Sequence, residues 1–215
     1  SNIPAWIFYT SGTTGNPKGA VLTHQNLLAM SYAYFADVGE ITELDTRLHC
    51  APMSHGSGLY AIPFILKGAN NIISPKGFDP DYITNVLSNR QNISFFAAPT
   101  MIKLLMQSDS VGGDISGLKT ICYGGGPMYL SDIKKALQIF GPSLYQLYGQ
   151  GESPMTISNI TKKMHSSSED VDLDYILSSV GTARRGVEFA IFSDKGEEML
   201  HDTIGEIVTR SSCVM

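Results

Sequence analysis

The chain has 215 residues, of which 43% are hydrophobic and 16% are charged, and its formal net charge is −5. This length and composition are typical of a globular chain with a sizeable core. The 15 basic residues form no cluster, which excludes the electrostatic footprint of a nucleic-acid partner. No apolar run reaches the roughly 18 residues that a membrane-spanning helix needs.

Cysteine usage and the chain ends indicate the compartment. The three cysteines Cys50, Cys122 and Cys213 lie far apart, which is typical of a reducing cytoplasm rather than of a disulfide scaffold. Residues 1–4 lack the basic start and apolar core of a signal peptide. We therefore expect a cytoplasmic protein. Both ends stop close to strand-like patterns, so we also expect the 215 residues to form part of a larger domain.

The first third of the chain predicts short strands joined by a polar loop and a helix. The strands are expected at residues 5–9, 20–23, 48–51 and 71–74. Between the first two lies a loop over 10–19 that is rich in glycine and hydroxyl side chains. After the second strand, helical apolar spacing begins behind Thr23, a plausible N-cap.

The middle third alternates strands and helices. Asp79-Pro80 predicts a helix start, and Ser131 and Gly141 predict the two ends of a later helix. The remaining elements are expected as strands at 93–98, 120–123 and 144–148 and a helix at 100–107. The run at 93–98 is apolar throughout, which indicates a strand that is buried on both faces. This alternation predicts an α/β fold with a largely parallel sheet flanked by helices.

The pattern changes after Glu152. Residues 153–178 predict an exposed polar loop region, and residues 179–215 predict a smaller β-rich end. In that end, 187–192 and 204–209 alternate like the strands of a hairpin. We therefore divide the chain into a nucleotide-binding α/β part over 1–152, the polar loop and the β-rich end.

The loop at residues 10–19 is the strongest chemical signal. It holds four hydroxyl side chains, three glycines and one lysine. Glycines let backbone N–H groups approach an anion, while the hydroxyls and Lys18 add hydrogen bonds and charge. It is not a Walker A loop, because it lacks Gly-Lys-Ser/Thr and joins two strands. The alternative interpretation is a glycine-rich hairpin turn, but such a turn does not require four hydroxyl side chains and a lysine.

Residues 9–19, Y-T-S-G-T-T-G-N-P-K-G, resemble the signature loop of the adenylate-forming (AMP-binding) superfamily. That superfamily includes acyl- and aryl-CoA synthetases, adenylation domains of nonribosomal peptide synthetases, and luciferases. The resemblance places this chain in the large N-terminal domain of such an enzyme. It implies that a group of loop residues holds the β- and γ-phosphates of ATP, namely Thr10, Ser11, Gly12, Thr13, Thr14, Gly15 and Lys18.

Two further motifs follow neighbouring predicted strands. Gly124-Gly125-Gly126-Pro127 follows the strand at 120–123, and Tyr148-Gly149-Gln150-Gly151-Glu152 follows the strand at 144–148. In a parallel sheet both emerge at the carboxyl edge, where open α/β folds bind ligands. The glycines could form a flat backbone shelf, Tyr148 could stack on a base, and Glu152 is an oxygen ligand that suits Mg²⁺.

Both motifs resemble segments of the same superfamily. The triple glycine resembles the segment that lines the adenine pocket, and Tyr148, Gly149 and Glu152 match the family's Y-G-x-T-E. The resemblance implies that the tyrosine packs on adenine and that Glu152 helps to hold Mg²⁺. The chain departs from the pattern at Gly151, where the family has a threonine that contacts the α-phosphate. Loss of one hydroxyl hydrogen bond costs about 1 kcal/mol, which weakens activity without excluding it.

A fourth segment, residues 52–58, resembles the family's P-x-x-H-x-x-G stretch. The resemblance implies that His55 borders the acyl pocket and the incoming nucleotide. By residue type alone, a lone histidine is more often structural. Residues 52–60 contain no acid, which argues against an α-amino acid substrate. Nothing in the sequence indicates a role for Arg184 or Arg185.

The resemblance implies a two-step reaction. A substrate carboxylate attacks the α-phosphate of ATP, pyrophosphate leaves, and coenzyme A takes the acyl group from the acyl-adenylate. Thr10, Lys18, His55 and Glu152 are the expected catalytic residues. Three alternatives stay open: transfer to a carrier-protein thiol, phosphoryl transfer that yields ADP, and a non-catalytic nucleotide-binding module. We expect the isolated chain to bind ATP weakly without turnover; its acid substrate and oligomeric state are not determined by the sequence.

Overall fold

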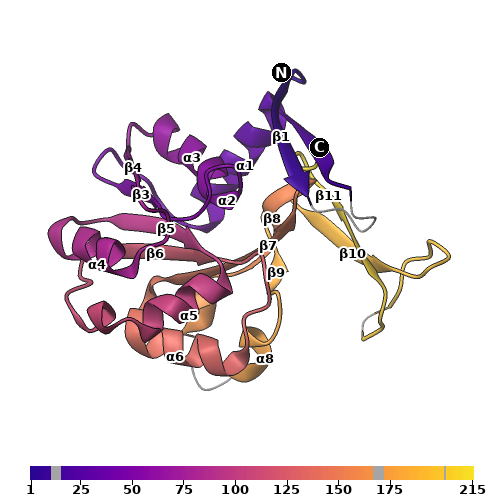
Figure 1. Cartoon of the computed structure of the whole chain (residues 1–215). Helices are drawn as coiled ribbons and strands as arrows, with labels where there is room; N and C mark the ends of the chain where they lie inside the picture. Colours follow the sequence, from indigo (N-terminus) through magenta and orange to yellow (C-terminus); the bar gives the residue numbers. More distant parts are fainter. Residues whose placement is uncertain (11–15, 167–171, 201) are drawn as a thin grey trace.

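The computed structural model describes residues 1–10, 16–166, 172–200 and 202–215 (Figure 1). Its centre is a seven-stranded sheet with the order β4-β3-β5-β6-β7-β8-β9. In chain order these strands are β3 (Thr46–His49), β4 (Asn70–Ile73), β5 (Ile93–Ala97), β6 (Leu118–Tyr123), β7 (Leu144–Gln150), β8 (Ser153–Ile160) and β9 (Thr182–Ala183). The pairs from β4 to β7 are parallel, whereas β8 and β9 run antiparallel to their neighbours. The predicted α/β class with a largely parallel sheet is therefore confirmed.

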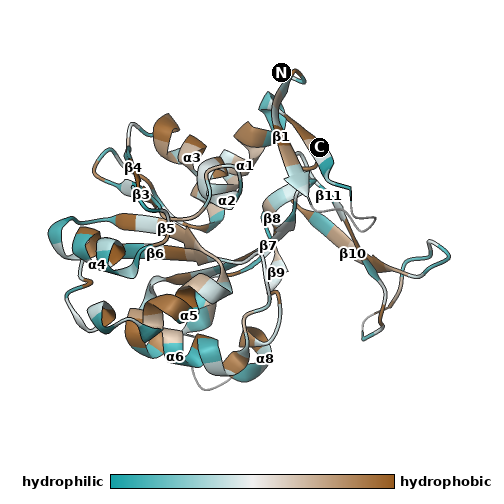
Figure 2. Ribbon diagram, in the orientation of Figure 1, coloured by the Kyte–Doolittle hydropathy of each residue, from teal (hydrophilic) through white to brown (hydrophobic). Residues whose placement is uncertain are grey.

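Helices cover both faces of this sheet (Figure 1). One group is α1 (His24–Asp37), α2 (Gly56–Leu59) and α3 (Ala61–Leu66); the other is α4 (Pro80–Asn89), α5 (Pro99–Gln107) and α6 (Leu130–Phe140). Short pieces complete the set: α7 (Lys162–His165), α8 (Leu173–Leu177) and the 3₁₀ turns Asp109–Gly112 and Gly141–Ser143. Figure 2 shows that α4, α5 and α6 each carry a hydrophobic and a hydrophilic side.

Two hydrophobic cores result, one on each face of the sheet. Leu48, Phe95 and Ile121 pack with α4, α5 and α6, and none of these three side chains is exposed. On the other face, Cys122 and Tyr145 pack with α1, α2 and α3. Strand β5 contributes to both cores, because Phe95 belongs to the first and Phe96 packs against the second. The prediction that this strand is buried on both faces is therefore confirmed.

Local capping explains where the main helices begin and end. Thr23 forms a capping box with Asn26, and the Asp79 carboxylate accepts hydrogen bonds from two backbone N–H groups of α4, as predicted. Gly141 ends α6 with a φ of 56°, a conformation that favours glycine. The prediction that Ser131 caps α6 is wrong. The helix begins at Leu130 behind Tyr129, which makes no side-chain cap.

The prediction of an exposed loop over 153–178 is also wrong for the first part of that range. Residues 153–160 form strand β8, and every residue of β8 is buried. Its polar side chains find partners inside the protein: Ser153 hydrogen-bonds to Thr156, and the Ser158 hydroxyl donates to the carbonyl of Val180. Polar composition therefore does not indicate exposure here, because these hydroxyls are satisfied by neighbouring strands and loops.

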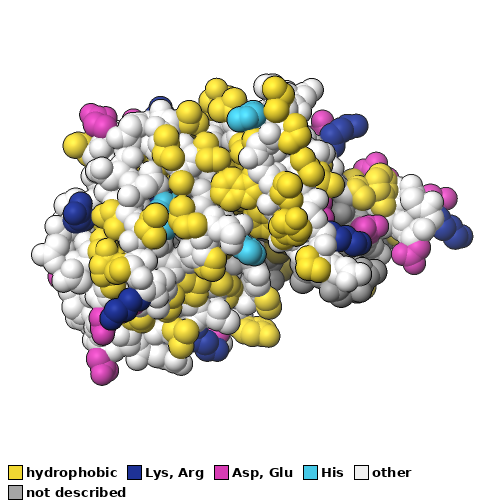
Figure 3. Space-filling model, turned by 45° about the horizontal axis from the view of Figure 1, so that its top comes forward, with side chains coloured by type: hydrophobic (Ala, Val, Ile, Leu, Met, Phe, Trp, Pro, Cys, Tyr) yellow, Lys and Arg dark blue, Asp and Glu magenta, His cyan; other side chains and the backbone are white. Residues whose placement is uncertain are grey.

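Two antiparallel hairpins lie beside the sheet. The first joins β1 (Pro4–Thr10) to β2 (Lys18–Thr23), as predicted, and the second pairs β10 (Glu188–Phe192) with β11 (Glu206–Arg210). Figure 3 shows hydrophobic side chains spread over the face that carries α1, α3 and the first hairpin. Within the described ranges, no helix is both long and apolar enough to cross a membrane.

A buried histidine beneath β6 makes stability depend on pH. His165 accepts a hydrogen bond from the Tyr123 hydroxyl through Nε2, since Nδ1 lies 2.8 Å from the Thr161 carbonyl oxygen to which it donates. Burial lowers the pKa of His165 below its usual 6.5, against the opposing effect of the Thr161 hydrogen bond. The folded protein therefore keeps this imidazole neutral where the unfolded chain binds a proton.

We expect the free energy of unfolding to be highest above pH 6.5 and to fall as the pH drops from there toward the lowered pKa of His165. Urea denaturation at several pH values between about 7.5 and 5.5 measures this slope. His165→Gln should reduce this slope, of which a part remains because burial also lowers the pKa of His49, whereas the same change at the exposed His24 should leave the slope unchanged. An unchanged slope in His165→Gln would contradict the assignment.

Candidate active site

The predicted convergence of two motifs at one sheet edge is present in the structure. Strands β6 and β7 are parallel neighbours, so the loops after Tyr123 and Gln150 leave the sheet on the same side. The first loop lies directly against β7, because a Cβ added at Gly124 would be 2.2 Å from the carbonyl oxygen of Leu147. Only glycine permits this approach.

A cavity of about 500 Å³ lies on one side of this junction. It brings together five of the residues expected to bind nucleotide: Gly125, Gly126, Pro127, Tyr148 and Gly149. The remaining lining comes from Met128, Gln146, Leu147, Ser178, Ser179 and Val180. The combination of a glycine shelf, a half-buried tyrosine and several polar groups suits a flat heteroaromatic base.

Gln146 is a functional candidate that the sequence analysis missed. Its side-chain Nε2 donates to the carbonyl of Ser179, but its buried Oε1 has no hydrogen-bond partner among the described residues. A buried acceptor without a partner costs about 1–3 kcal/mol. Because Gln146 lines this cavity, a ligand amino group could satisfy it. The sequence feature that could have identified Gln146 is its position two residues before Tyr148, which puts both side chains on the same face of β7.

A second cavity, of about 380 Å³, lies on the other side of the junction and shares Gly125, Leu147 and Gly149 with the first. It also brings together four other expected site residues, His55, Gly124, Gln150 and Gly151. The rest of its lining consists of Phe8, Ala51, Pro52, Gly56, Ser57, Leu59, Phe96, Ala98, Met101, Pro154 and Met155. No lysine, arginine, aspartate or glutamate belongs to this described lining, so the cavity suits an apolar group.

The β1–β2 hairpin reaches this second cavity. Phe8 and His55 stack edge to face with their ring centroids 5.3 Å apart, and Ser54 hydrogen-bonds to Nδ1 of His55. Thr10 and Lys18 are paired in the hairpin, and Lys18 is exposed. The phosphate-binding residues expected between them, Ser11, Gly12, Thr13, Thr14 and Gly15, lie outside the described residues.

Gly151 is buried where the hairpin meets the end of β7. A Cβ added there would be 2.4 Å from Cγ2 of Thr10 and 3.0 Å from Cδ1 of Phe8. The departure from the expected threonine is therefore more than a missing hydroxyl. In this packing the space of that side chain is taken by Thr10 and Phe8, which lie closer to the sheet than a larger residue would permit.

Glu152 is half-buried, next to Gly151, and lines neither cavity. The described residues hold no group of three or more His, Cys, Asp or Glu that could bind a metal by itself. Mg²⁺ commonly takes one or two carboxylates and completes its shell with water and substrate phosphates. A single glutamate therefore fits a magnesium ion that is bound together with a polyphosphate.

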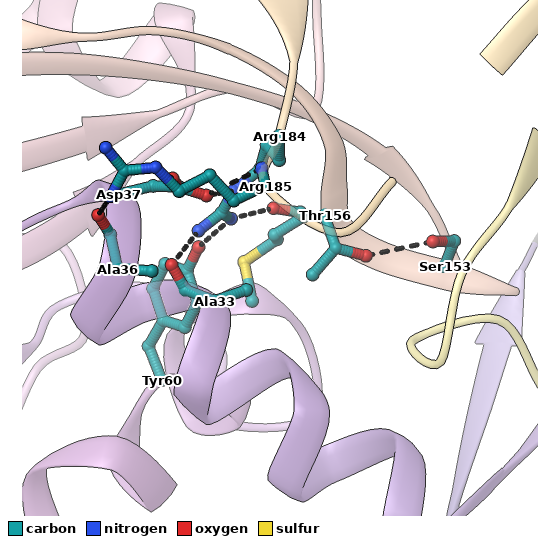
Figure 4. A network of polar contacts seen from close by, with 9 residues as sticks. Ala33, Ala36, Asp37, Tyr60, Ser153, Thr156, Arg184 and Arg185 are labelled. Carbon is teal, nitrogen blue, oxygen red and sulfur yellow. Dashed lines mark hydrogen bonds and ion pairs between the residues drawn. The ribbon is translucent and has the colours of Figure 1, made fainter. Parts of the chain in front are cut away.

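The structure explains the two arginines that the sequence left without a role. Arg184 is 1% exposed and forms an ion pair with Asp37, at 3.1 Å, on helix α1 (Figure 4). Its guanidinium also donates to the Tyr60 hydroxyl and to the backbone carbonyls of Ala33 and Met155. Arg185 is exposed and reaches the same Asp37 and the carbonyl of Ala36. Arg184 thus ties α1 to β8, beside the second cavity.

We expect Gly151→Thr to destabilise the fold by about 1–3 kcal/mol, because the added side chain overpacks the contact with Thr10 and Phe8. Thr10→Ser removes the clashing methyl group, so the double variant should recover part of the loss. Urea denaturation of both single variants and the double variant measures this coupling. Gly112→Thr, where an added Cβ meets nothing within 4 Å, is the matched control. Purely additive effects would contradict the packing argument.

Comparison with known proteins agrees with this geometry. The family described as AMP-binding enzyme matches residues 1–215. A medium/long-chain-fatty-acid–CoA ligase of Mycobacterium tuberculosis is 30% identical over 200 residues, which cover 93% of this chain and 34% of the relative. A 2-succinylbenzoate–CoA ligase of Bacillus cytotoxicus is 30% identical over 208 residues, covering 95% of this chain and 40% of the relative. The chain thus spans little more than a third of the length of these curated relatives.

Solved structures show the same architecture. An amide bond synthetase from Marinactinospora thermotolerans superposes with a TM-score of 0.83 at 26% identity, covering 97% of this chain and 40% of that one. The O-succinylbenzoate coenzyme A synthetase of Bacillus subtilis, in complex with AMP, gives a TM-score of 0.83 at 26% identity and covers all of this chain and 42% of its own. From its motifs, its paired cavities and these matches, the chain belongs to the family of AMP-binding, adenylate-forming enzymes.

Proposed function

We propose that this chain is the nucleotide- and acid-binding part of an AMP-forming acyl- or aryl-CoA ligase. The observation that carries the proposal is the pair of cavities that meet at Gly125, Leu147 and Gly149. One suits a purine base and the other an apolar acyl group. With both cavities occupied, the α-phosphate of a nucleotide and the carboxylate of an acid would meet at this shared wall. Curated relatives that are CoA ligases support this function.

In the proposed reaction the substrate carboxylate is the nucleophile, so the protein needs no nucleophilic side chain. The carboxylate attacks the α-phosphate of ATP, a P–O bond forms, and the bond to pyrophosphate breaks. Catalysis then consists of positioning and charge neutralisation. Thr10, Lys18 and the loop between them would bind the β- and γ-phosphates, and His55 would border the acid. A bound Mg²⁺, held partly by Glu152, would supply charge neutralisation of the phosphates.

In the second step the coenzyme A thiol would attack the acyl carbon and AMP would leave. Coenzyme A is favoured over a carrier-protein thiol because the curated CoA ligases cover nearly all of this chain at 30% identity. A non-catalytic nucleotide-binding module remains the second candidate, and the observation that favours it is Gly151 in place of the family's threonine.

The direct test is carboxylate-dependent exchange between ATP and labelled pyrophosphate, measured on the longest natural polypeptide that carries this sequence. A panel of fatty, aryl and amino acids covers the main substrate classes. We expect exchange with fatty or aryl acids and AMP as the product. ADP formation would support phosphoryl transfer instead. ATP binding without exchange for any acid would support the non-catalytic module.

Base recognition can be tested on the chain itself. We expect Gln146→Leu to weaken AMP binding about fivefold, the equivalent of roughly 1 kcal/mol for one lost hydrogen bond. GMP should bind the unsubstituted chain more weakly than AMP, because its C6 carbonyl would face the Gln146 Oε1 acceptor instead of an amino group. Isothermal titration calorimetry measures both affinities. Gln107→Leu, at an exposed position on α5, is the control, and equal losses for AMP and GMP in Gln146→Leu would contradict the assignment.

A further inference from the structure

Met155 stands out in the wall of the apolar cavity because its backbone is strained. Its φ is 61°, in the left-handed region that non-glycine residues rarely adopt. Its side chain is only 6% exposed and belongs to the cavity lining. Backbone strain of this kind persists only where the surroundings enforce it, and it is concentrated at ligand sites.

Met155 lies against Gly149 of the nucleotide-binding motif, since a Cβ added at Gly149 would be 2.3 Å from the Met155 nitrogen. Its sulfur is 3.0 Å from the position that a Cβ would take at Gly56, and a ring carbon of Phe96 lies 3.5 Å from the same point. Met155, Phe96 and Gly56 therefore meet at one place in the lining. An acyl group that occupies this cavity beside His55 would contact Met155 here.

A hydrogen bond from Arg184 holds the Met155 backbone in place. One guanidinium nitrogen donates to the Met155 carbonyl oxygen at 2.6 Å, and the Arg184 backbone N–H donates to the Ile157 carbonyl at 3.1 Å. The other guanidinium contacts anchor Arg184 to Asp37 and Ala33 on α1 and to Tyr60 after α2. A guanidinium that donates four hydrogen bonds in this way cannot move without breaking several of them.

We propose that Arg184 is a positioning residue that locks Met155 as the end wall of an acyl pocket, and that this wall sets the size of an uncharged, apolar acyl group. The inference rests on the proposed function. The absence of charged side chains from the described lining gives the substrate class, since a second carboxylate buried here would have no cationic partner.

The test uses non-reactive acyl-sulfamoyl-adenosines, which present the nucleotide and the acyl group together, and AMP as the acyl-free reference. Affinities for the chain are measured by calorimetry across hexanoyl, octanoyl, dodecanoyl, hexadecanoyl and benzoyl derivatives. An adipoyl derivative, in which a carboxylate replaces the terminal methyl group of hexanoyl, tests charge. We expect adipoyl to bind at least tenfold more weakly than hexanoyl, and equal affinities would overturn the proposed substrate class.

Met155→Gly removes the wall and relieves the strain, because glycine accepts the left-handed conformation. We expect it to raise the ratio of dodecanoyl to hexanoyl affinity at least fivefold while AMP affinity changes less than twofold. Arg184→Lys keeps the charge but cannot make the same set of hydrogen bonds, so the same ratio should move in the same direction. Arg185→Ala, at an arginine that contacts Asp37 but not Met155, is the matched control and should leave the ratio unchanged.

The failure of this inference is distinct from failure of the proposed function. If AMP and the acyl-adenosines do not bind the unsubstituted chain, the proposed function itself is overturned. If they bind but Met155→Gly lowers all acyl affinities by the same factor, Met155 does not set acyl size. If Met155→Gly shifts the ratio and a folded Arg184→Lys does not, the positioning role of Arg184 is overturned.

Discussion

The buried guanidinium of Arg184 joins three parts of this fold that are far apart in the sequence. Arg184 is 1% exposed and acceptors surround its guanidinium, and removal of one partner from a buried ion pair typically costs several kcal/mol. Its acceptors come from α1, from Tyr60 after α2, and from β8. These elements are far apart in sequence and must therefore be placed together. The apolar cavity is bounded by two of them, so its shape depends on this network.

The nucleotide side of the site depends on a different constraint, which is close backbone approach. Gly124 lies against β7, and Gly149 lies against β8, where an added Cβ would be 2.3 Å from the Met155 nitrogen. Together they bring the glycine shelf, Tyr148 and Gln146 around one cavity. Because Gly149 also borders the apolar cavity and touches Met155, the two constraints meet there. A ligand that spans both cavities would therefore contact the glycine-rich motif as well as Met155.

The errors in the sequence-based prediction share a physical cause. Strand β8 contains several hydroxyl side chains and was expected to be exposed, yet hydrogen bonds within the protein let it be buried completely. Helix α6 begins before Ser131 because Leu130 packs against the core on that face of the sheet. In both places tertiary packing overrides a local preference, which is the usual limit of patterns read over a few residues.

The sequence by itself determined the parallel α/β fold, the hairpin around residues 10–19 and the convergence of two glycine-rich motifs at one sheet edge, because each follows from local spacing. It also carried the family resemblance. Only the tertiary structure decided that two cavities share one wall, that the Gln146 acceptor has no partner among the described residues, that a side chain at Gly151 would clash with Thr10 and Phe8, and that Arg184 holds Met155. These features arise from contacts between residues far apart along the chain, and such contacts leave no periodic trace in the sequence.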